Sequence, residues 1–360
     1  RPVTVTLAGR GARRALRIAN RQAFTGLGWL RADYELLLAG EVVRRGRLAV
    51  PQVGALSDAT VPLPAELPAG DGEVHLSVRW TTLAATPWAP KGHLVAWDQV
   101  QLRAPAKAAA PAVSPPRPGR SRITVGTARD VDRVLAAPVE LTLWRAATDN
   151  DGFKLMPELA QRLRVGGQAL GHWQDAGVDQ LPAEQLVQHR VERSEVDGGI
   201  EYRHTVVVPP ELADLPRVGV QFSLPARFRR VRWFGRGPHE NYPDRRSGAM
   251  LGVWEGEPDA LPYLVPQEFG LRTDCRWFEC TDPARSQTLR VEALRVATPV
   301  HGAGQAPALH CSATHSSAAD LFTASTATEV SPRRELIVHL DAAHRGLGTA
   351  SCGPDVLPQY

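Results

Sequence analysis

The sequence predicts an all-β fold, and two observations carry that prediction. The 31 glycines and 30 prolines are spread over all 360 residues and divide the chain into short segments. Most of these segments alternate apolar and polar residues with a period of two, which is the pattern of a strand with one buried face. Convincing helical patterns are few, and residues 156–164 are the best candidate.

The clearest strand candidates share this alternation. Residues 73–80 read EVHLSVRW, so that Val, Leu, Val and Trp would point to one side of the strand and the polar residues to the other. Three later segments repeat the pattern, namely residues 201–208, 217–224 and 335–340. Residues 1–7 are also strand-like and begin without Met, and we therefore expect the chain to be a piece of a longer polypeptide.

A compositional break predicts two domains. Residues 104–119 (APAKAAAPAVSPPRPG) are rich in Ala and Pro and contain no aromatic residue, so they are expected to form an extended linker. Residues 1–103 before it have the size of a seven-stranded sandwich. Residues 120–360 after it are expected to form one large β domain.

Composition narrows the possible partners. The net charge is +4, and Arg rather than Lys supplies the positive charge. Arg and Lys do not cluster with stacking aromatic residues, so no nucleic-acid partner is expected. An apolar run of about 18 residues is missing, so no membrane span is predicted. The chain has four cysteines without a Cys-x-x-Cys pair, which argues against a zinc motif or a disulfide scaffold and favours the reducing cytoplasm.

The segment at residues 233–246 (WFGRGPHENYPDRR) combines turn-forming and reactive residues. In one interpretation, His239 and Glu240 act as base and acid in proton chemistry. In the other, Glu240 and Asp244 pair with nearby arginines or backbone N–H groups and stiffen a scaffold turn. The residues of interest in this motif are Arg236, His239, Glu240, Asn241, Asp244 and Arg245.

Two further segments carry chemistry-bearing residues. Residues 144–152 (WRAATDNDG) resemble the start of a calcium loop but lack its later ligands, so that an Asx-turn network is the alternative. Residues 339–355 (HLDAAHRGLGTASCGPD) contain glycines that would let the backbone approach a ligand closely. Cys352 could be a nucleophile activated by His344, or the segment could be a loop that lines a pocket made with another domain.

The nine tryptophans allow two interpretations. Exposed indole rings could form stacking platforms of a carbohydrate-binding module, whereas buried rings would belong to the sandwich cores. Because such rings more often belong to a sandwich core, we expect the core for most of them.

Taken together, these motifs resemble the C-terminal region of bacterial β-galactosidases of glycoside hydrolase family two. The resemblance is carried in the second domain by residues 144–152, 233–254 (WFGRGPHENYPDRRSGAMLGVW), 262–277 (PYLVPQEFGLRTDCRW) and 339–355. In the first domain, residues 34–36, 62–64 and 91–99 are similar to the family's Ig-like domain. The chain departs from the family pattern at Ala147, Phe269 and Leu271, and the stretch between residues 120 and 143 is short for the family.

The resemblance implies a fold and a division of labour. It implies an Ig-like β-sandwich followed by a large antiparallel β-sandwich similar to galactose mutarotase. The two catalytic glutamates of the retaining mechanism, with magnesium and sodium, would lie in a preceding barrel, so that no catalytic residue, metal ligand or cofactor is expected in this chain. The expected partners are that barrel, a β-galactoside substrate and further copies of the enzyme in a homo-oligomer.

The resemblance also assigns roles to the motifs. The segment around Glu240 becomes a scaffold turn, and the C-terminal segment becomes one loop of the substrate pocket. In some family members a Trp stands where this chain has Cys352, so that weaker contact with the leaving group is expected. The predicted pocket-loop residues are His344, Arg345, Ser351, Cys352 and Asp355. A free-standing sugar epimerase that uses His239 and Glu240, or a carbohydrate-binding module, is the alternative function.

Overall fold

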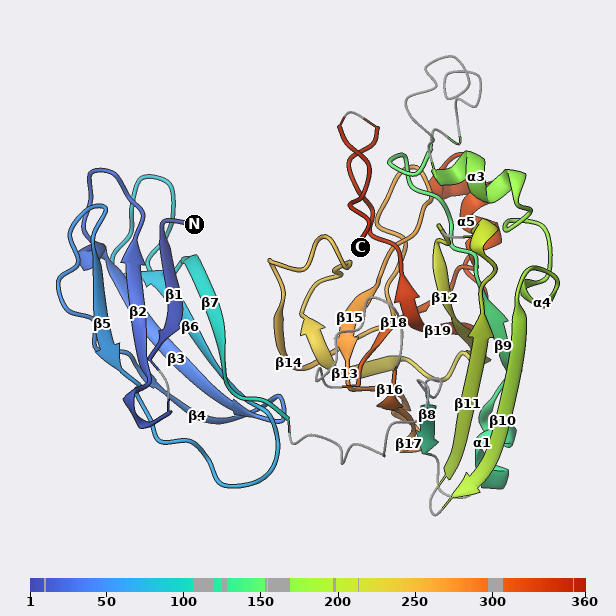
Figure 1. Ribbon diagram of the computed structural model, residues 1–360, viewed down its shortest axis with the longest axis horizontal. Helices are drawn as coiled ribbons and strands as arrows, with labels where there is room; N and C mark the ends of the chain where they lie inside the picture. The colour runs from blue at the N-terminus through green and yellow to red at the C-terminus, as the bar shows by residue number, and fades with distance from the viewer. Residues whose placement is uncertain are drawn as a thin grey trace. The chain divides into compact units, whose positions relative to one another are not determined.

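The computed structural model describes residues 1–9, 11–105, 120–124, 128–152, 154, 169–196, 199–212, 214–296, 307–351 and 353–360. It divides into two compact units. Unit 1 contains residues 1–110 together with residues 250–253, and unit 2 contains residues 111–249 and 254–360. Both units are built mainly of strands (Figure 1).

Unit 1 is made of two antiparallel sheets. A three-stranded sheet has the order β1-β2-β5, and a four-stranded sheet has the order β4-β3-β6-β7. The strands are β1 (Val3–Ala8), β2 (Ala15–Asn20), β3 (Leu30–Leu38), β4 (Glu41–Arg47), β5 (Asp58–Pro62), β6 (Val74–Thr82) and β7 (Leu94–Arg103). Two single 3-10 turns, η1 (Gly11–Arg13) and η2 (Leu27–Trp29), precede β2 and β3.

The core of unit 1 follows from the alternation within its strands. In β6, Val74, Leu76, Val78 and Trp80 are all buried. They pack in one cluster with apolar residues of β1, β2 and β3, which come from both sheets. Burial of one face of each sheet against the other is the packing of a β-sandwich.

Apart from residues 250–253 of β14, which are assigned to unit 1, a larger pair of sheets lies in unit 2. The seven-stranded sheet has the order β10-β11-β8-β17-β16-β13-β14, and the five-stranded sheet has the order β15-β18-β19-β12-β9. The strands are β8 (Arg120–Thr124), β9 (Ala137–Thr142), β10 (Gln188–Val196), β11 (Gly199–Val207), β12 (Arg217–Leu224), β13 (Arg230–Gly237), β14 (Met250–Gly256), β15 (Arg272–Cys275), β16 (Trp277–Asp282), β17 (Gln287–Arg295), β18 (Leu309–Thr314) and β19 (Leu336–His344).

Short helices accompany the sheets of unit 2. The α-helices are α1 (Ala128–Val134), α3 (Ala169–Asp175), α4 (Ala183–Leu186) and α5 (Ala318–Thr323), and the 3-10 turns are η3 (Pro210–Leu212) and η4 (Ala327–Glu329). Helix α5 begins with a capping box, in which Ser317 and Asp320 each accept the other's backbone N–H. Trp173 of α3 is buried in a small cluster beside β9.

One core joins the two sheets of unit 2. It combines Phe222 of β12 and Val338 of β19 from the five-stranded sheet with Trp233 of β13 and Phe278 of β16 from the seven-stranded sheet. The sheets therefore pack as a sandwich, and the predicted all-β fold is confirmed in both units.

The individual strand predictions can be compared with this structure. Residues 217–224 form β12 as predicted. The predicted segments 73–80 and 201–208 contain most of β6 and β11, and the segment 335–340 contains much of β19. The region from residue 120 to 143, expected to be short, contributes β8, α1 and β9. The helix expected at residues 156–164 and the linker from residue 106 onward lie outside the described residues.

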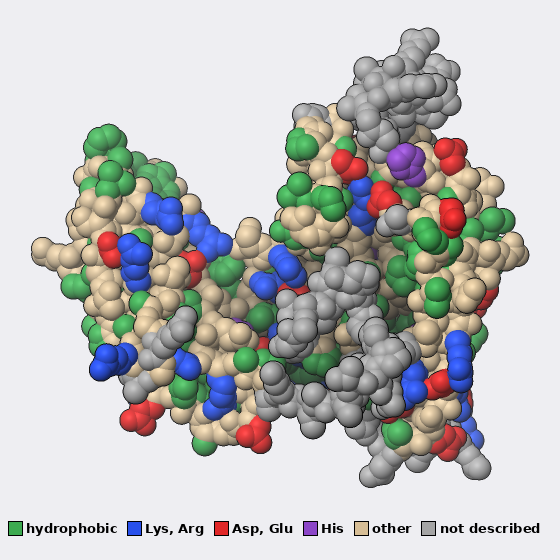
Figure 2. Space-filling view, viewed as in Figure 1, with side chains coloured by type: hydrophobic (Ala, Val, Ile, Leu, Met, Phe, Trp, Pro, Cys, Tyr) green, Lys and Arg blue, Asp and Glu red, His purple; other side chains and the backbone are tan. Residues whose placement is uncertain are grey.

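Several predictions concern the cysteines and the surface. Cys275, Cys280 and Cys311 are buried free thiols, whereas Cys352 lies outside the described residues. Acidic and basic side chains are interspersed over the visible face of the molecule (Figure 2). Among the helices that the structure describes, none is long and apolar enough to cross a membrane.

Candidate functional site

The segment after β19, residues 345–356, is called the C-terminal loop here, and it rises from the end of that strand as a narrow excursion (Figure 1). Its two sides are joined by internal hydrogen bonds. The Gly353 N–H donates to the Thr349 carbonyl over 2.7 Å, and the Thr349 hydroxyl donates to the Pro354 carbonyl over 2.9 Å. The loop is therefore closed on itself on either side of position 352.

Arg345 closes the base of the loop. Its Nε donates to Asp214 over 2.7 Å, and its Nη2 donates to Asp355 at the far end of the loop over 2.8 Å. A third carboxylate, that of Asp151, lies 3.5 Å from Nη1. Because the guanidinium is nearly buried and contacts three carboxylates, the two ends of the loop are held together by charge-assisted bonds.

The turn motif reaches the C-terminal loop through Asp244. Its two carboxylate oxygens accept hydrogen bonds from the backbone N–H groups of Leu347 and Gly348, over 3.1 and 2.8 Å. The apolar side of the same contact is a small buried cluster of Tyr242, Leu271 and Leu347. Residues more than a hundred positions apart in the sequence thus form one assembly.

The segment at residues 144–152 also contacts the loop. The Asn150 amide donates to the Gly348 carbonyl over 3.0 Å, and its oxygen accepts the Ser351 hydroxyl over 2.7 Å. Asn150 therefore fixes the residue immediately before Cys352. The structure places Ser351, Arg345 and Asp355 in this assembly. Cys352 itself lies outside the described residues.

Asp151, the last residue of the Asp-Asn-Asp sequence, binds other residues of the segment 144–152. Asp151 is completely buried and makes a two-point ion pair with Arg145, with both N–O distances at 2.8 Å. The backbone N–H and the hydroxyl of Thr148 donate to the same carboxylate. These bonds order the segment locally, with the Asp151 carboxylate accepting from a residue three positions earlier in the chain.

Within the turn motif, Glu240 and Asn241 bind neighbouring backbone and side chains. The Glu240 carboxylate accepts hydrogen bonds from the Tyr263 hydroxyl and from the Gly270 N–H. Burial, followed by this bond to Glu240, raises the pKa of Tyr263 to about 12. Buried Asn241 accepts from the backbone and side chain of Thr273.

The arginines of the turn motif have separate partners. Arg236 and Arg246 both bind Asp274, and Arg236 also donates to the Ala249 carbonyl. Burial opposes ionisation of Asp274, but the attraction of Arg236, His310 and Arg246 outweighs it and lowers the pKa of this carboxyl group. Arg245 lies over the Tyr242 ring, and His239 is exposed.

His344 lies in a buried polar cluster beneath the loop. Its Nδ1 is 2.8 Å from the Arg345 carbonyl, so this nitrogen is the donor. Burial lowers the pKa of His344 to about 4, although Glu268 at 3.7 Å works in the opposite direction. The ring also lies against Tyr242.

Sequence reasoning missed three charged residues of this cluster. Arg217 lies between Glu268 at 3.4 Å and Asp341 at 3.2 Å, and all three side chains are buried. Burial opposes ionisation of Glu268, but Arg217, His344 and Arg145 together outweigh it, and the pKa falls to about 2. For Asp341 burial dominates, and its pKa rises to about 7. The available signal concerned Asp341, a charged residue within the largely apolar strand β19.

The tryptophans divide between core and surface. Trp80, Trp173 and Trp233 are buried, which supports the core interpretation for them. Trp88 is 62% exposed and packs edge-on against Trp29 in unit 1. A single exposed indole does not make a sugar-binding platform of the kind considered above.

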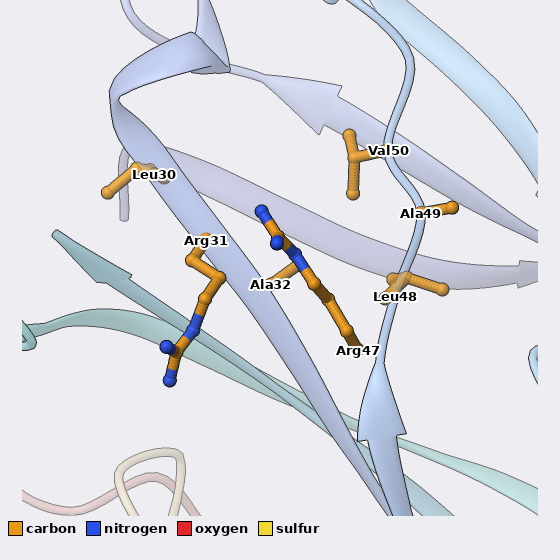
Figure 3. A pocket seen from close by; sticks show the side chains of 7 residues that line it. All are labelled: Leu30, Arg31, Ala32, Arg47, Leu48, Ala49 and Val50. Atoms are coloured by element: carbon orange, nitrogen blue, oxygen red, sulfur yellow. The ribbon is translucent and has the colours of Figure 1, made fainter. Parts of the chain in front are cut away.

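Two hollows lined by described residues are relevant to a binding site, and the first lies beside Asp214, a partner of Arg345. One of about 250 Å³ in unit 2 is lined by His172, Trp173 and Asp214, among others. The other, of about 470 Å³ in unit 1, lies between the start of β3 and residues 48–50, and Figure 3 shows the Arg47 side chain extending across it. No residue predicted as functional lines either hollow. No cluster of three or more His, Cys, Asp or Glu suited to a metal ion occurs among the described residues.

Comparison with known proteins places these units in a family. Residues 122–360 match the family model described as the β-galactosidase small chain, and residues 16–103 match the model of β-galactosidase domain 4. The chain is 31% identical to a β-galactosidase from Arthrobacter sp. (strain B7), covering 89% of this chain and 35% of the relative.

Other relatives are similar in kind. A β-galactosidase from Priestia megaterium is 30% identical over 55% of this chain and 22% of the relative. One from Aeromonas hydrophila is 27% identical over 92% of this chain and 35% of the relative. The chain spans about a third or less of the length of these three relatives. Because the small-chain model alone matches well over half of its residues, the chain belongs to the β-galactosidase family.

Proposed function

We propose that this chain is the C-terminal, non-barrel part of a retaining β-galactosidase, which hydrolyses terminal non-reducing β-D-galactose residues. The observation that carries the proposal is the C-terminal loop, which Arg345 closes at its base and which Asp244 and Asn150 hold along its length. A loop held by several side chains can present its residues to a ligand at a fixed position. In this proposal the loop forms one side of the galactoside pocket.

The catalytic carboxylates belong to another part of the enzyme in this proposal. A retaining glycosidase needs two carboxyl groups about 5 Å apart and free to reach the sugar. Glu240 is instead bound by Tyr263 and Gly270, and Asp151 is bound by Arg145. The catalytic pair, and the magnesium and sodium of the complete enzyme, are therefore assigned to a catalytic barrel.

The partners follow from the same proposal. The barrel, on the same polypeptide or on a separate chain, would contact the C-terminal loop, and the complete enzyme would form a homo-oligomer. The buried free thiols of Cys275, Cys280 and Cys311 suit a reducing compartment, and we place the enzyme in the cytoplasm.

Hydrolysis of a chromogenic β-galactoside tests the division of labour. The complete enzyme is expected to release the chromophore, and the 360-residue chain alone is expected to release none above the uncatalysed rate. Turnover by the isolated chain at the rate of the complete enzyme would place catalysis in this chain and overturn the proposal. In the complete enzyme, Cys352→Ala tests the loop, because a pocket residue should change KM for the galactoside.

The geometry does not favour a sugar epimerase built on His239 and Glu240. The Glu240 carboxylate is engaged by two donors, and the His239 side chain is exposed. Polarimetry with α-galactose separates the two functions, because an epimerase would speed its conversion to the β-anomer and Glu240→Gln would abolish that effect. Calorimetric titration with galactans would detect a carbohydrate-binding module by measurable heats.

A further inference from the structure

The C-terminal loop is positioned by a residue of the turn motif. The turn itself is rigid, because the Arg245 N–H donates to the Tyr242 carbonyl over 2.9 Å and the Tyr242 ring is buried. Asp244 stands inside this turn. Its carboxylate is therefore presented to the loop from a fixed point of the sandwich.

The loop backbone is shaped to receive that carboxylate. Gly348 has a φ of +64°, which is a left-handed conformation that favours glycine. With this geometry, the successive N–H groups of Leu347 and Gly348 converge on Asp244 as a small anion-binding nest. A Cβ at Gly346 would lie 2.6 Å from the Asp244 Cγ, so the backbone passes directly against the carboxylate.

A second fixing point lies on the side of the loop that leads to its tip. Asn150 binds the Gly348 carbonyl and both polar groups of Ser351. Asp244 and Asn150 thus bind the two faces of the same peptide region, through N–H groups on one side and a carbonyl on the other. Leu347, Gly348 and Ser351 are therefore held in place by these two side chains.

We propose that Asp244 is a positioning residue for galactoside recognition, acting through Leu347 and Gly348, with Asn150 as its counterpart. This inference rests on the proposed function, because it assumes that the loop faces the sugar or its leaving group. Neither residue is proposed to touch the substrate. Their effect is to hold the loop in one conformation, so that binding does not have to order it.

The test compares Asp244→Asn and Asn150→Ala with the parent in the complete enzyme. Asn at position 244 keeps the shape but turns an NH2 group toward one of the two backbone donors. We expect amide hydrogen exchange at residues 347 and 348 to accelerate by roughly tenfold or more, because a bond to a charged acceptor is lost. KM for an aryl β-galactoside should rise by about tenfold while kcat stays within about twofold.

Two controls make the outcomes distinct. Asp132→Asn removes an exposed carboxylate of α1 that pairs with Arg193, and it should change neither exchange nor KM. Cys352→Ala tests the loop directly. If Cys352→Ala raises KM while both positioning variants leave it unchanged, the inference is wrong and the proposed function stands.

If Asp244→Asn, Asn150→Ala and Cys352→Ala all leave KM unchanged, the proposed role of the loop is wrong. The positioning role is then wrong as well. Normal exchange at residues 347 and 348 in Asp244→Asn would also overturn the positioning role, whatever the value of KM. Asn150→Ala supplies an independent answer if Asp244→Asn does not fold.

Discussion

Arg145 and Asp151 form an ion pair with two N–O distances of 2.8 Å, and neither side chain has any exposure to solvent. The Arg145 guanidinium also lies over the Trp173 ring and 3.5 Å from the Gly346 carbonyl of the C-terminal loop. This pair therefore lies beneath the loop that the proposed function uses, and it connects the stability of unit 2 to the position of that loop.

Breaking this pair should destabilise unit 2 strongly. Asp151→Asn leaves the Arg145 charge buried without its partner, and we expect a loss of about 3–5 kcal/mol in the free energy of unfolding. Urea denaturation measures it. Asp132→Asn, which breaks an exposed pair with Arg193, should cost less than about 1 kcal/mol. Similar losses in the two variants would contradict the role given to the buried pair.

The stability of unit 2 should depend on pH through Asp341. Its pKa is about 7 in the folded chain, because the carboxyl group is buried, against 3.8 as its ordinary value. Between these values the folded chain holds a proton that the unfolded chain has lost, so this contribution is complete at low pH and disappears as pH rises through 7. Arg217, Glu268 and Arg145 act on the same carboxyl group.

Asp341→Asn removes this titration. Relative to the parent, the variant should gain about 2 kcal/mol in the free energy of unfolding when pH rises from 5 to 8. Subtracting the parent's free energy of unfolding from the variant's at each pH cancels the contribution of His344, because His344 titrates in both proteins. Urea denaturation at several pH values checks the slope, and Asp132→Asn should give a difference that does not vary with pH. A flat difference for Asp341→Asn would refute the assignment.

Gly219 in β12 should not tolerate a side chain. A Cβ there would lie 2.6 Å from the Leu340 carbonyl oxygen and 2.7 Å from the Asp341 Cα, and backbone atoms cannot move aside cheaply. We expect Gly219→Ala to cost at least about 2 kcal/mol in thermal or urea unfolding. The matched control is Gly248→Ala, where a Cβ meets nothing within 4 Å, and it should be nearly neutral. Equal effects at the two positions would be incompatible with this packing.

Asn241 should be essential to the turn motif. Its side chain donates to the His239 carbonyl and accepts from the buried backbone N–H and hydroxyl of Thr273. Asn241→Ala leaves those Thr273 groups without this acceptor, and we expect a loss of about 2–4 kcal/mol in the free energy of unfolding. Removing the Thr273 hydroxyl as well, in Thr273→Val, should then cost little more, because the bond it made is already gone. Additive losses would argue against a direct bond.

The sequence by itself determined the all-β class and many strand positions. Alternation with a period of two is a local property, so residues 217–224 could be recognised as a strand before any partner strand was known. The order of several long motifs likewise indicated the family. These inferences needed only neighbouring residues or their order along the chain.

Only the tertiary structure decided what the charged residues do. Nothing near Asp244 in sequence indicates that it binds Leu347 and Gly348, because that contact depends on how two distant segments meet across the sandwich. Arg217 and Asp341 were missed for the same reason, because the sequence shows them only as polar residues in strands. Their burial is set by which face of β12 and β19 the core covers, and that choice is made when the sheets pack.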